Sequence, residues 1–219
     1  MTTVITASLA AVALAVLVGG TGVLARRFAW EPELARKVSH VTVGLASLAL
    51  PFVFASVVPV LILAVVACAG LLALRVAPAL RARFGCALHG VTRVSFGEFA
   101  FVGGVALAFV LAHDSVPAYA AAVLTLALGD AAAALIGRRF GRHPYTAGGA
   151  RKSLEGSAAF FAVAVLVGAL IPGAESVAAV AVFALATTLA EAFAGDGFDN
   201  AAIPLAGLLA LRLFSGAGS

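Results

Sequence analysis

The chain has 219 residues and a formal net charge of +4, and it is 63% hydrophobic with only 11% charged residues. A soluble domain carries roughly 25% charged residues, so this composition excludes a soluble globular protein. We expect no secretory signal, because nothing before Arg26 is charged and such a signal begins with a basic segment. Two cysteines are too few for a disulfide framework. The sequence therefore predicts a single membrane-embedded domain over residues 1–219.

Apolar runs long enough to cross a bilayer, about 17–25 residues each, follow one another along the chain. Pro51 and Pro59 divide the second run from the third, because proline interrupts a helix. The last run is short and the seventh ends loosely, so the number of spans is seven or eight. The sequence predicts an all-α, polytopic integral membrane protein with spans at about 4–25, 38–56, 58–75, 97–113, 116–137, 154–172, 176–194 and 198–214.

Lys and Arg gather in alternate loops. Cytoplasmic loops collect these residues, so an outside N-terminus puts loops 26–37, 75–96, 138–153 and 195–197 in the cytoplasm. Among the 14 Lys and Arg residues, only Arg212 then falls near the outer side. The positive charge is explained by this topology and by a site for anions, and it does not indicate a nucleic-acid partner. We expect loop 75–96, which mixes Arg with Phe and Leu, to lie along the membrane surface.

Most acidic residues fall at or just within the predicted cytoplasmic ends of spans. Asp130 lies about 10 Å along its helix from Gly137, where an ionised carboxylate costs a few kcal/mol unless it is paired or hydrated. A structural ion pair with an arginine of another span is one explanation of Asp130, and a hydrated cation site is the explanation that we favour. The residues at these ends are Glu31, Glu33, Glu98, Asp130, Glu155, Glu191, Asp196 and Asp199.

Four of these carboxylates are candidate metal ligands, because Mg²⁺ prefers carboxylate oxygens together with substrate phosphates. They are Asp130, Glu191, Asp199 and Glu98. A helix N-cap is the alternative for Asp199, and a favourable position in the helix dipole is the alternative for Glu98. Glu191 has no such alternative.

Two basic segments are candidate anion sites. Arg151, Lys152 and Glu155 are predicted to open a helix, where main-chain N–H groups and cations attract phosphate. A cytoplasmic flank is the alternative for Lys152 and for Arg138. In the other segment, His40 shares a helical face with Arg36 and Lys37; it would carry a proton, bind phosphate or simply lie at the interface.

The motifs RKVSH, GE, GDAAAALIGRRFGRH, KSLEGS and DN follow one another over about residues 31–205. In this order they resemble the polyprenol kinase family, which includes dolichol, phytol and farnesol kinases and the CTP-dependent diacylglycerol kinase, and is related to CDP-diacylglycerol synthases. The resemblance implies CTP as phosphoryl donor, Mg²⁺, and a membrane-embedded alcohol as acceptor.

The resemblance also implies site residues, one position at a time. The matching motif positions are Arg36, Lys37, His40, Glu98, Asp130, Gly137, Gly141, Lys152, Ser153, Glu155, Gly156, Glu191, Asp199 and Asn200. With the basic residues beside them, the candidate catalytic residues are Asp130, Lys152, His40 and Glu155. The candidate nucleotide-binding residues are Lys37, Arg36, Gly137, Arg138, Arg151, Ser153, Gly156 and Asn200.

We therefore expect a CTP-dependent kinase that phosphorylates a membrane isoprenoid alcohol, of the phytol, farnesol or polyprenol type, at the cytoplasmic face. A CDP-diacylglycerol synthase-like cytidylyltransferase or a CTP-dependent diacylglycerol kinase is the alternative. An anion transporter is less favoured, because the outer half of the spans carries almost no polar residues. The expected partners are CTP, the lipid alcohol and the bilayer. The sequence does not name the alcohol, since any apolar residues can build a lipid groove.

Overall fold

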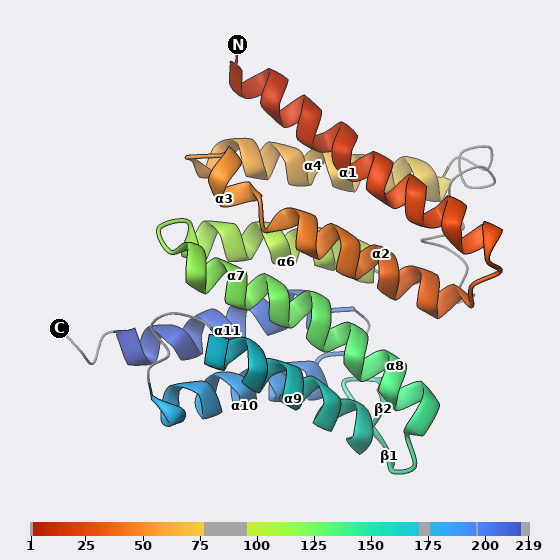
Figure 1. The fold of residues 1–219 in the computed structure, drawn as a ribbon, viewed down its shortest axis with the longest axis vertical. Helices are drawn as coiled ribbons and strands as arrows, with labels where there is room; N and C mark the ends of the chain where they lie inside the picture. The colour runs from red at the N-terminus through yellow and green to blue at the C-terminus, as the bar shows by residue number, and fades with distance from the viewer. Residues whose placement is uncertain (1, 77–95, 171–175, 196, 216–219) are drawn as a thin grey trace.

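The computed structural model describes residues 2–76, 96–170, 176–195 and 197–215, and nearly all of them are helical (Figure 1). This confirms the predicted all-α class. The helices are α1 (Thr2–Arg27), α2 (Pro32–Ser47), α3 (Leu50–Val53), α4 (Val57–Val76), α6 (Gly97–Ala112), α7 (Val116–Leu124), a π-helical turn (Thr125–Gly129), α8 (Asp130–Phe140), α9 (Leu154–Leu170), α10 (Val177–Phe193) and α11 (Asp199–Ser215).

Among the described helices, three are long and apolar enough to cross a membrane: Val4–Arg27, Val57–Val76 and Val116–Phe140. The last of these is a continuous helix made of α7, the π turn and α8. The helices α6, α9 and α10 are apolar but shorter. These helices support a polytopic membrane protein, and the number of seven or eight spans stays a prediction.

The helix predicted over 38–56 has different bounds. It begins at Pro32 and ends at Ser47, and the separate short helix α3 follows. Proline fits the first turn of a helix because its missing N–H has no partner there. The prediction was wrong because it followed hydropathy, and the first half of α2 is polar: it buries Lys37 and His40 inside the protein.

A small β-hairpin separates α8 from α9. Strand β1 (Pro144–Ala147) pairs antiparallel with β2 (Ala150–Ser153), so that Tyr145 lies opposite Lys152. The turn residues Gly148 and Gly149 have φ angles of +54° and +76°, which a two-residue hairpin turn requires and glycine adopts freely. The prediction that Arg151 and Lys152 open a helix was therefore wrong, since they lie in a strand and α9 begins at Leu154.

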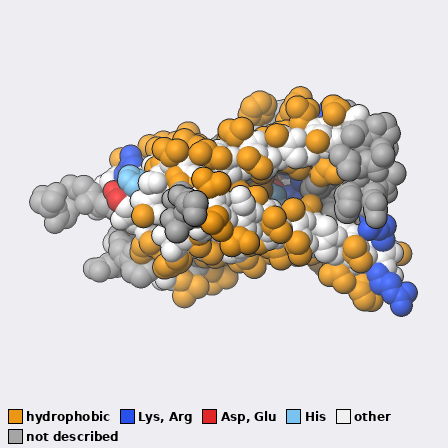
Figure 2. Space-filling view, turned by 90° about the horizontal axis from the view of Figure 1, so that it is seen from above, with side chains coloured by type: hydrophobic (Ala, Val, Ile, Leu, Met, Phe, Trp, Pro, Cys, Tyr) orange, Lys and Arg blue, Asp and Glu red, His pale blue; other side chains and the backbone are white. Residues whose placement is uncertain are grey.

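The helices alternate in direction and stack in layers, with α1 and α4 at one side and α9 and α10 at the other (Figure 1). At one end of the bundle, α1, α4, α8 and α10 end and α2, α6, α9 and α11 begin. We call this the basic end, because every described Lys and Arg except Arg212 lies in or beside it. Figure 2 shows apolar side chains over most of one face, with charged side chains gathered at its two ends. The surface-lying segment expected at 75–96 falls almost entirely outside the described residues.

Small residues bring the helices close together near the basic end. A Cβ atom on Gly156 would lie 2.8 Å from the carbonyl oxygen of Ala133, and one on Gly137 would lie 3.5 Å from the Cα atom of Gly156. Small residues on α8 and α9 thus let these two helices pack closely. Likewise, a Cβ atom on Gly44 would lie 2.5 Å from that of Ala127. The helix α8 is therefore packed closely against α9, and the π turn before it is packed closely against α2.

Candidate active site

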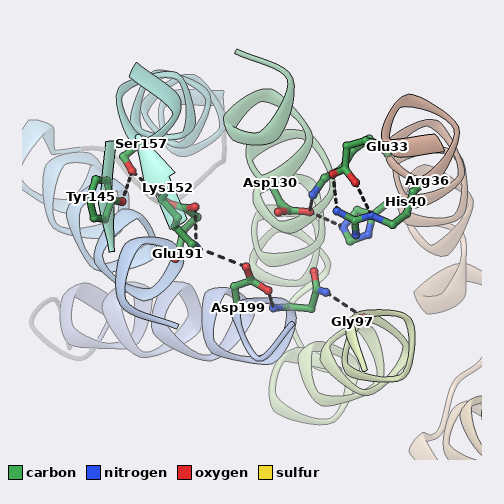
Figure 3. Close-up of polar contacts among 12 residues, drawn as sticks. Glu33, Arg36, His40, Gly97, Asp130, Tyr145, Lys152, Ser157, Glu191 and Asp199 are labelled. Carbon is green, nitrogen blue, oxygen red and sulfur yellow. Dashed lines mark hydrogen bonds and ion pairs between the residues drawn. The ribbon is translucent and has the colours of Figure 1, made fainter. Parts of the chain in front are cut away.

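Two buried groups of charged side chains lie at the basic end (Figure 3). The Asp130 cluster consists of Lys37 and His40 from α2 and Asp130 from α8. The Lys152 cluster consists of Lys152 from β2, Glu191 from α10 and Asp199 from α11. The structure thus brings six of the predicted site residues together from five separate elements.

In the Asp130 cluster, both basic side chains lie next to the same carboxylate oxygen. Lys37 Nζ donates to Asp130 Oδ2 at 2.5 Å, and His40 Nε2 lies 3.4 Å from the same oxygen. Lys37 is only 3% exposed and Asp130 7% exposed, so the pair is shielded from solvent. The sequence had left open an ion pair between Asp130 and an arginine, and the partner is instead a lysine.

The π turn sets the direction of Asp130. It ends at Gly129, immediately before Asp130, and the wider turn changes which side of the following helix faces α2. A Cβ atom on Gly129 would lie 2.8 Å from the ring of Phe160 on α9. The His40 ring also hydrogen bonds with the backbone of Leu126, in the same turn, and packs against the Phe101 ring at a tilt of 44°, with 4.0 Å between ring centroids. Packing therefore fixes both Asp130 and His40.

Arg36 and Glu98 lie beside this cluster rather than in it. Glu33 accepts two hydrogen bonds from Arg36, at 3.0 Å to Nε and 2.6 Å to Nη2. Glu98 lies in the first turn of α6, and both Asp130 and Glu98 lie within electrostatic reach of the Arg36 guanidinium. The guanidinium is thus already paired, and within the described residues no hydrogen bond or ion pair joins Glu98 to Asp130, Glu191 or Asp199.

In the Lys152 cluster, one ammonium group bridges two carboxylates. Lys152 Nζ lies 2.8 Å from Glu191 Oε1 and 3.5 Å from Asp199 Oδ2, and it also donates to the main-chain carbonyl of Glu191. Burial alone would lower the pKa of Lys152, but Glu191, Asp199 and Asp130 outweigh it and raise the pKa above its ordinary value. Because Asp130 contributes to this effect, the two clusters lie within electrostatic reach of each other.

Two residues that the sequence analysis did not select support Glu191. Ser157 Oγ donates to Glu191 Oε2 at 3.3 Å, and the Tyr145 hydroxyl lies 2.6 Å from Ser157 Oγ. Ser157 lies at the end of the KSLEGS motif, which was a usable signal. Tyr145 had none, because its place opposite Lys152 follows from the hairpin register.

Asn200, which follows Asp199, has one side-chain atom that is hydrogen bonded and one that is not. Its side-chain Nδ2 donates to the Gly97 carbonyl at 2.9 Å, while Oδ1 has no hydrogen-bond partner among the described residues. The residue is only 3% exposed. Its main-chain N–H donates to Asp199 Oδ1 at 3.0 Å. A buried acceptor without a donor loses its solvation with no compensation, so this atom is suited to a ligand.

Other predicted site residues have local structural roles. Ser153 Oγ accepts from the Gly156 N–H at 3.1 Å and caps α9. Glu155 pairs with the exposed His143, at 2.7 Å to Nδ1, away from both clusters. Arg138 pairs with the exposed Glu31, and the Arg151 side chain is exposed on β2. Gly137 and Gly156 pack against each other, as described above.

Comparison with known proteins gives a partial match. No known family profile matches the chain, and no solved structure matches it. The chain is similar to a phytol kinase of Synechocystis sp., with 34% identity over 133 residues that cover 56% of this chain and 56% of that protein. This similarity supports a relationship with the polyprenol and phytol kinase family. The chain matches only about half the length of this relative.

The donor atoms of the two clusters suit a hard divalent cation. Carboxylates and the free Asn200 Oδ1 are all oxygen ligands, which Mg²⁺ prefers. Within the part of the chain that the structure describes, however, no three His, Cys, Asp or Glu side chains converge closely enough to hold a metal ion. The carboxylates instead form ion pairs with Lys37 and Lys152. The chemistry of the donor set fits Mg²⁺, and its present arrangement is one in which lysines neutralise the carboxylates.

Proposed function

We propose that this chain is a lipid-alcohol kinase that transfers the γ-phosphoryl group of CTP to a membrane isoprenoid alcohol of the phytol, farnesol or polyprenol type. The observation that carries the proposal is the convergence of two lysines and three carboxylates at one end of an otherwise apolar bundle. The similarity to a phytol kinase gives independent support. The basic character of this end favours its assignment to the cytoplasmic side, with the N-terminus outside.

Phosphoryl transfer requires mainly positioning and charge neutralisation, and both clusters are suited to it. Lys37 and Lys152 would bind the donor phosphates, with Arg151 at the rim. Asp130, Glu191 and Asp199, with Asn200 Oδ1, would hold Mg²⁺, which when bound neutralises charge on those phosphates. The apolar helices around the site would receive the hydrocarbon tail directly from the bilayer.

In the transfer itself, the alcohol oxygen forms a bond to the γ-phosphorus, and the bond from that phosphorus to the β–γ bridging oxygen breaks. CDP leaves, and the hydroxyl proton passes to a base of the protein. Asp130 and His40 are the two candidates, because His40 Nε2 has no hydrogen-bond partner among the described residues and lies 3.4 Å from Asp130. His40 can thus accept a proton itself or pass it to the carboxylate.

A cytidylyltransferase is the principal alternative, since the same clusters would suit attack of a lipid phosphate on the α-phosphorus of CTP. A CTP-dependent diacylglycerol kinase differs only in its acceptor. An anion transporter is disfavoured, because the described charged clusters lie at the basic end of the bundle.

The test is an assay of the purified chain with CTP labelled either in the γ-phosphate or in cytosine. Phytol, farnesol, geranylgeraniol, undecaprenol and diacylglycerol are offered in turn, with ATP as the competing donor. The proposal predicts that γ-label appears on an isoprenoid alcohol and that cytosine label does not. Cytosine label on a lipid phosphate would establish the cytidylyltransferase instead, and label on diacylglycerol alone would reassign the acceptor.

A further inference from the structure

We infer that Lys37 and Lys152 act as internal cations that close the carboxylates to metal ions until a polyphosphate draws the lysines away. A divalent cation and a polyphosphate would then each bind well only in the presence of the other. The identity of the ligands rests on the proposed function, while the action of the lysines rests on the contacts below.

The first observation is that a lysine already contacts every carboxylate of the two clusters. Lys37 Nζ lies 2.5 Å from Asp130 Oδ2, and Lys152 Nζ lies 2.8 Å from Glu191 Oε1 and 3.5 Å from Asp199 Oδ2. A metal ion bound to any of these three oxygens would therefore lie close to a lysine ammonium group. At such separations two positive charges repel by several kcal/mol, even at an effective dielectric constant of about 20.

The second observation is that the site retains a buried atom that points to a ligand. Asn200 Oδ1 is an acceptor on a residue that is 3% exposed, and it has no partner among the described residues. The residue adjoins Asp199 of the Lys152 cluster, whose Oδ1 accepts a hydrogen bond from the Asn200 main-chain N–H at 3.0 Å. The carboxylates are therefore satisfied by lysines in this state, while an oxygen suited to a hard cation is left unsatisfied beside them.

The charge of the clusters explains why neither ligand binds well alone. Two ammonium groups and three carboxylates leave a net charge of about −1, which opposes a polyphosphate. The ammonium groups, while paired with the carboxylates, repel a divalent cation and so weaken its binding. When phosphate groups bind the two lysines in place of the carboxylates, they neutralise the ammonium charges. The carboxylates are then free to bind a metal ion. Binding energies coupled in this way are reciprocal, so each ligand raises the affinity of the other by the same factor.

The lysines rather than the nearby arginine are suited to this exchange. A lysine carries its charge on a flexible four-carbon stem and can swing between partners. Arg36 is held by two hydrogen bonds to Glu33, so its guanidinium is committed. On the other side, Ser157 holds Glu191 by its second oxygen, Oε2, so the carboxylate stays in place when Lys152 leaves Oε1.

The test measures binding without turnover, on the full-length chain in detergent micelles. Mn²⁺ is titrated alone, without nucleotide, and followed by its electron paramagnetic resonance. We expect weak binding to the wild type and at least a tenfold tighter binding to Lys37→Met and to Lys152→Met. Adding Asp130→Asn to Lys37→Met should remove the gain. The matched control is Arg139→Met, which removes one exposed positive charge from the same helix as Asp130 and should leave Mn²⁺ binding unchanged.

A second measurement keeps the inference testable if Lys37→Met does not fold. Inorganic triphosphate is titrated in the presence of a chelator, so that no metal ion is present. Asp130→Asn frees Lys37 and should bind triphosphate at least about fivefold more tightly than the wild type. The inference is overturned if the wild type binds Mn²⁺ alone as tightly as the folded lysine variants, or if Asp130→Asn binds triphosphate no better than the wild type.

These outcomes are separable from failure of the proposed function. If the lysine variants gain Mn²⁺ affinity but no label reaches a lipid alcohol, the proposed reaction fails and the lysine exchange stands. If label is transferred but the variants gain nothing, the reverse holds.

Discussion

The Asp130 and Lys152 clusters carry similar charges but are built differently. The Asp130 cluster lies between two helices, where the Lys37 side chain is 3% exposed and the Asp130 side chain 10%. The Lys152 cluster depends on a hairpin, and its Lys152 and Asp199 side chains are 12% and 18% exposed. Helix packing fixes the positions of the residues in the Asp130 cluster. In the Lys152 cluster, the position of Lys152 depends on the position of the hairpin.

Backbone contact holds that hairpin in place. A Cβ atom on Gly148 would collide with the Phe193 carbonyl, and one on Gly195 would collide with the Gly148 carbonyl. The turn of the hairpin thus rests directly on the end of α10, two to four residues beyond Glu191. The comparison suggests that the helical cluster is robust to small changes and the hairpin cluster is not, and the predictions below test that difference.

The largest effect should come from Asp130→Asn. Asparagine keeps the shape of the side chain but removes the charge that Lys37 and His40 face, so we expect the rate of phosphoryl transfer to fall by about 10³-fold or more. The measurement is transfer of γ-label from CTP to the alcohol found in the first assay. Asp114→Asn, in an exposed turn at the opposite end of the bundle, should keep the wild-type rate. Full activity of Asp130→Asn would contradict the assignment.

The lysines should differ in their effect on stability. Lys37→Met leaves a buried carboxylate without its partner, and we expect the free energy of unfolding to fall by about 3–5 kcal/mol. Lys152→Met leaves the partly exposed Asp199 and the buried Glu191 without this partner. Because Ser157 still donates to Glu191, we expect a smaller loss of about 1–3 kcal/mol. Thermal or denaturant unfolding in detergent measures both. Equal losses, or a larger loss for Lys152→Met, would show that burial does not distinguish the clusters.

Gly195→Ala should displace the hairpin and with it Lys152. Because misplacement of a catalytic group by about 1 Å can cost about 10²-fold, we expect a 10- to 100-fold lower transfer rate with the helices intact. Gly103→Ala is the control, since a Cβ atom there has no neighbour within 4 Å. Near wild-type activity of Gly195→Ala would mean that the hairpin does not need this contact.

The smallest effect should come from Ser157→Ala. It removes one hydrogen bond to Glu191 Oε2, worth about 1 kcal/mol, so we expect a rate loss of about fivefold. Ser176→Ala, which removes the cap of α10 at its opposite end, is the matched control for a lost serine hydroxyl, and its transfer rate should stay at the wild-type value. A loss above a hundredfold for Ser157→Ala would indicate that Ser157 contacts the reacting groups.

The difference between the clusters also explains what the sequence could predict. His40 and Asp130 stand out because titratable residues in apolar helices are rare and need a reason, and each lies in a span that hydropathy predicts. Lys37 lies just before the predicted span 38–56, and the RKVSH motif drew attention to it instead. The pairing of Asp130 with Lys37 rather than with an arginine could not be predicted, since it depends on the π turn before Asp130, for which hydropathy gives no sign.

The Lys152 cluster was harder to predict for a different reason. In the sequence, Gly148 and Gly149 are equally compatible with a loop before a helix and with a hairpin turn. Their positive φ angles create a hairpin, and this places Tyr145 opposite Lys152 and Ser157 beside Glu191. Those partners arise from register and long-range docking, which a single sequence does not encode in any local pattern.

The central claim is that both clusters act in one phosphoryl-transfer step. A double-mutant cycle tests it most directly, with γ-label transfer measured for Asp130→Asn, Lys152→Met and the double variant. If the clusters form one site, the double variant loses about as much as the worse single variant, because groups that act as a unit are non-additive. If the two fold-losses multiply, the clusters act independently and the account is contradicted.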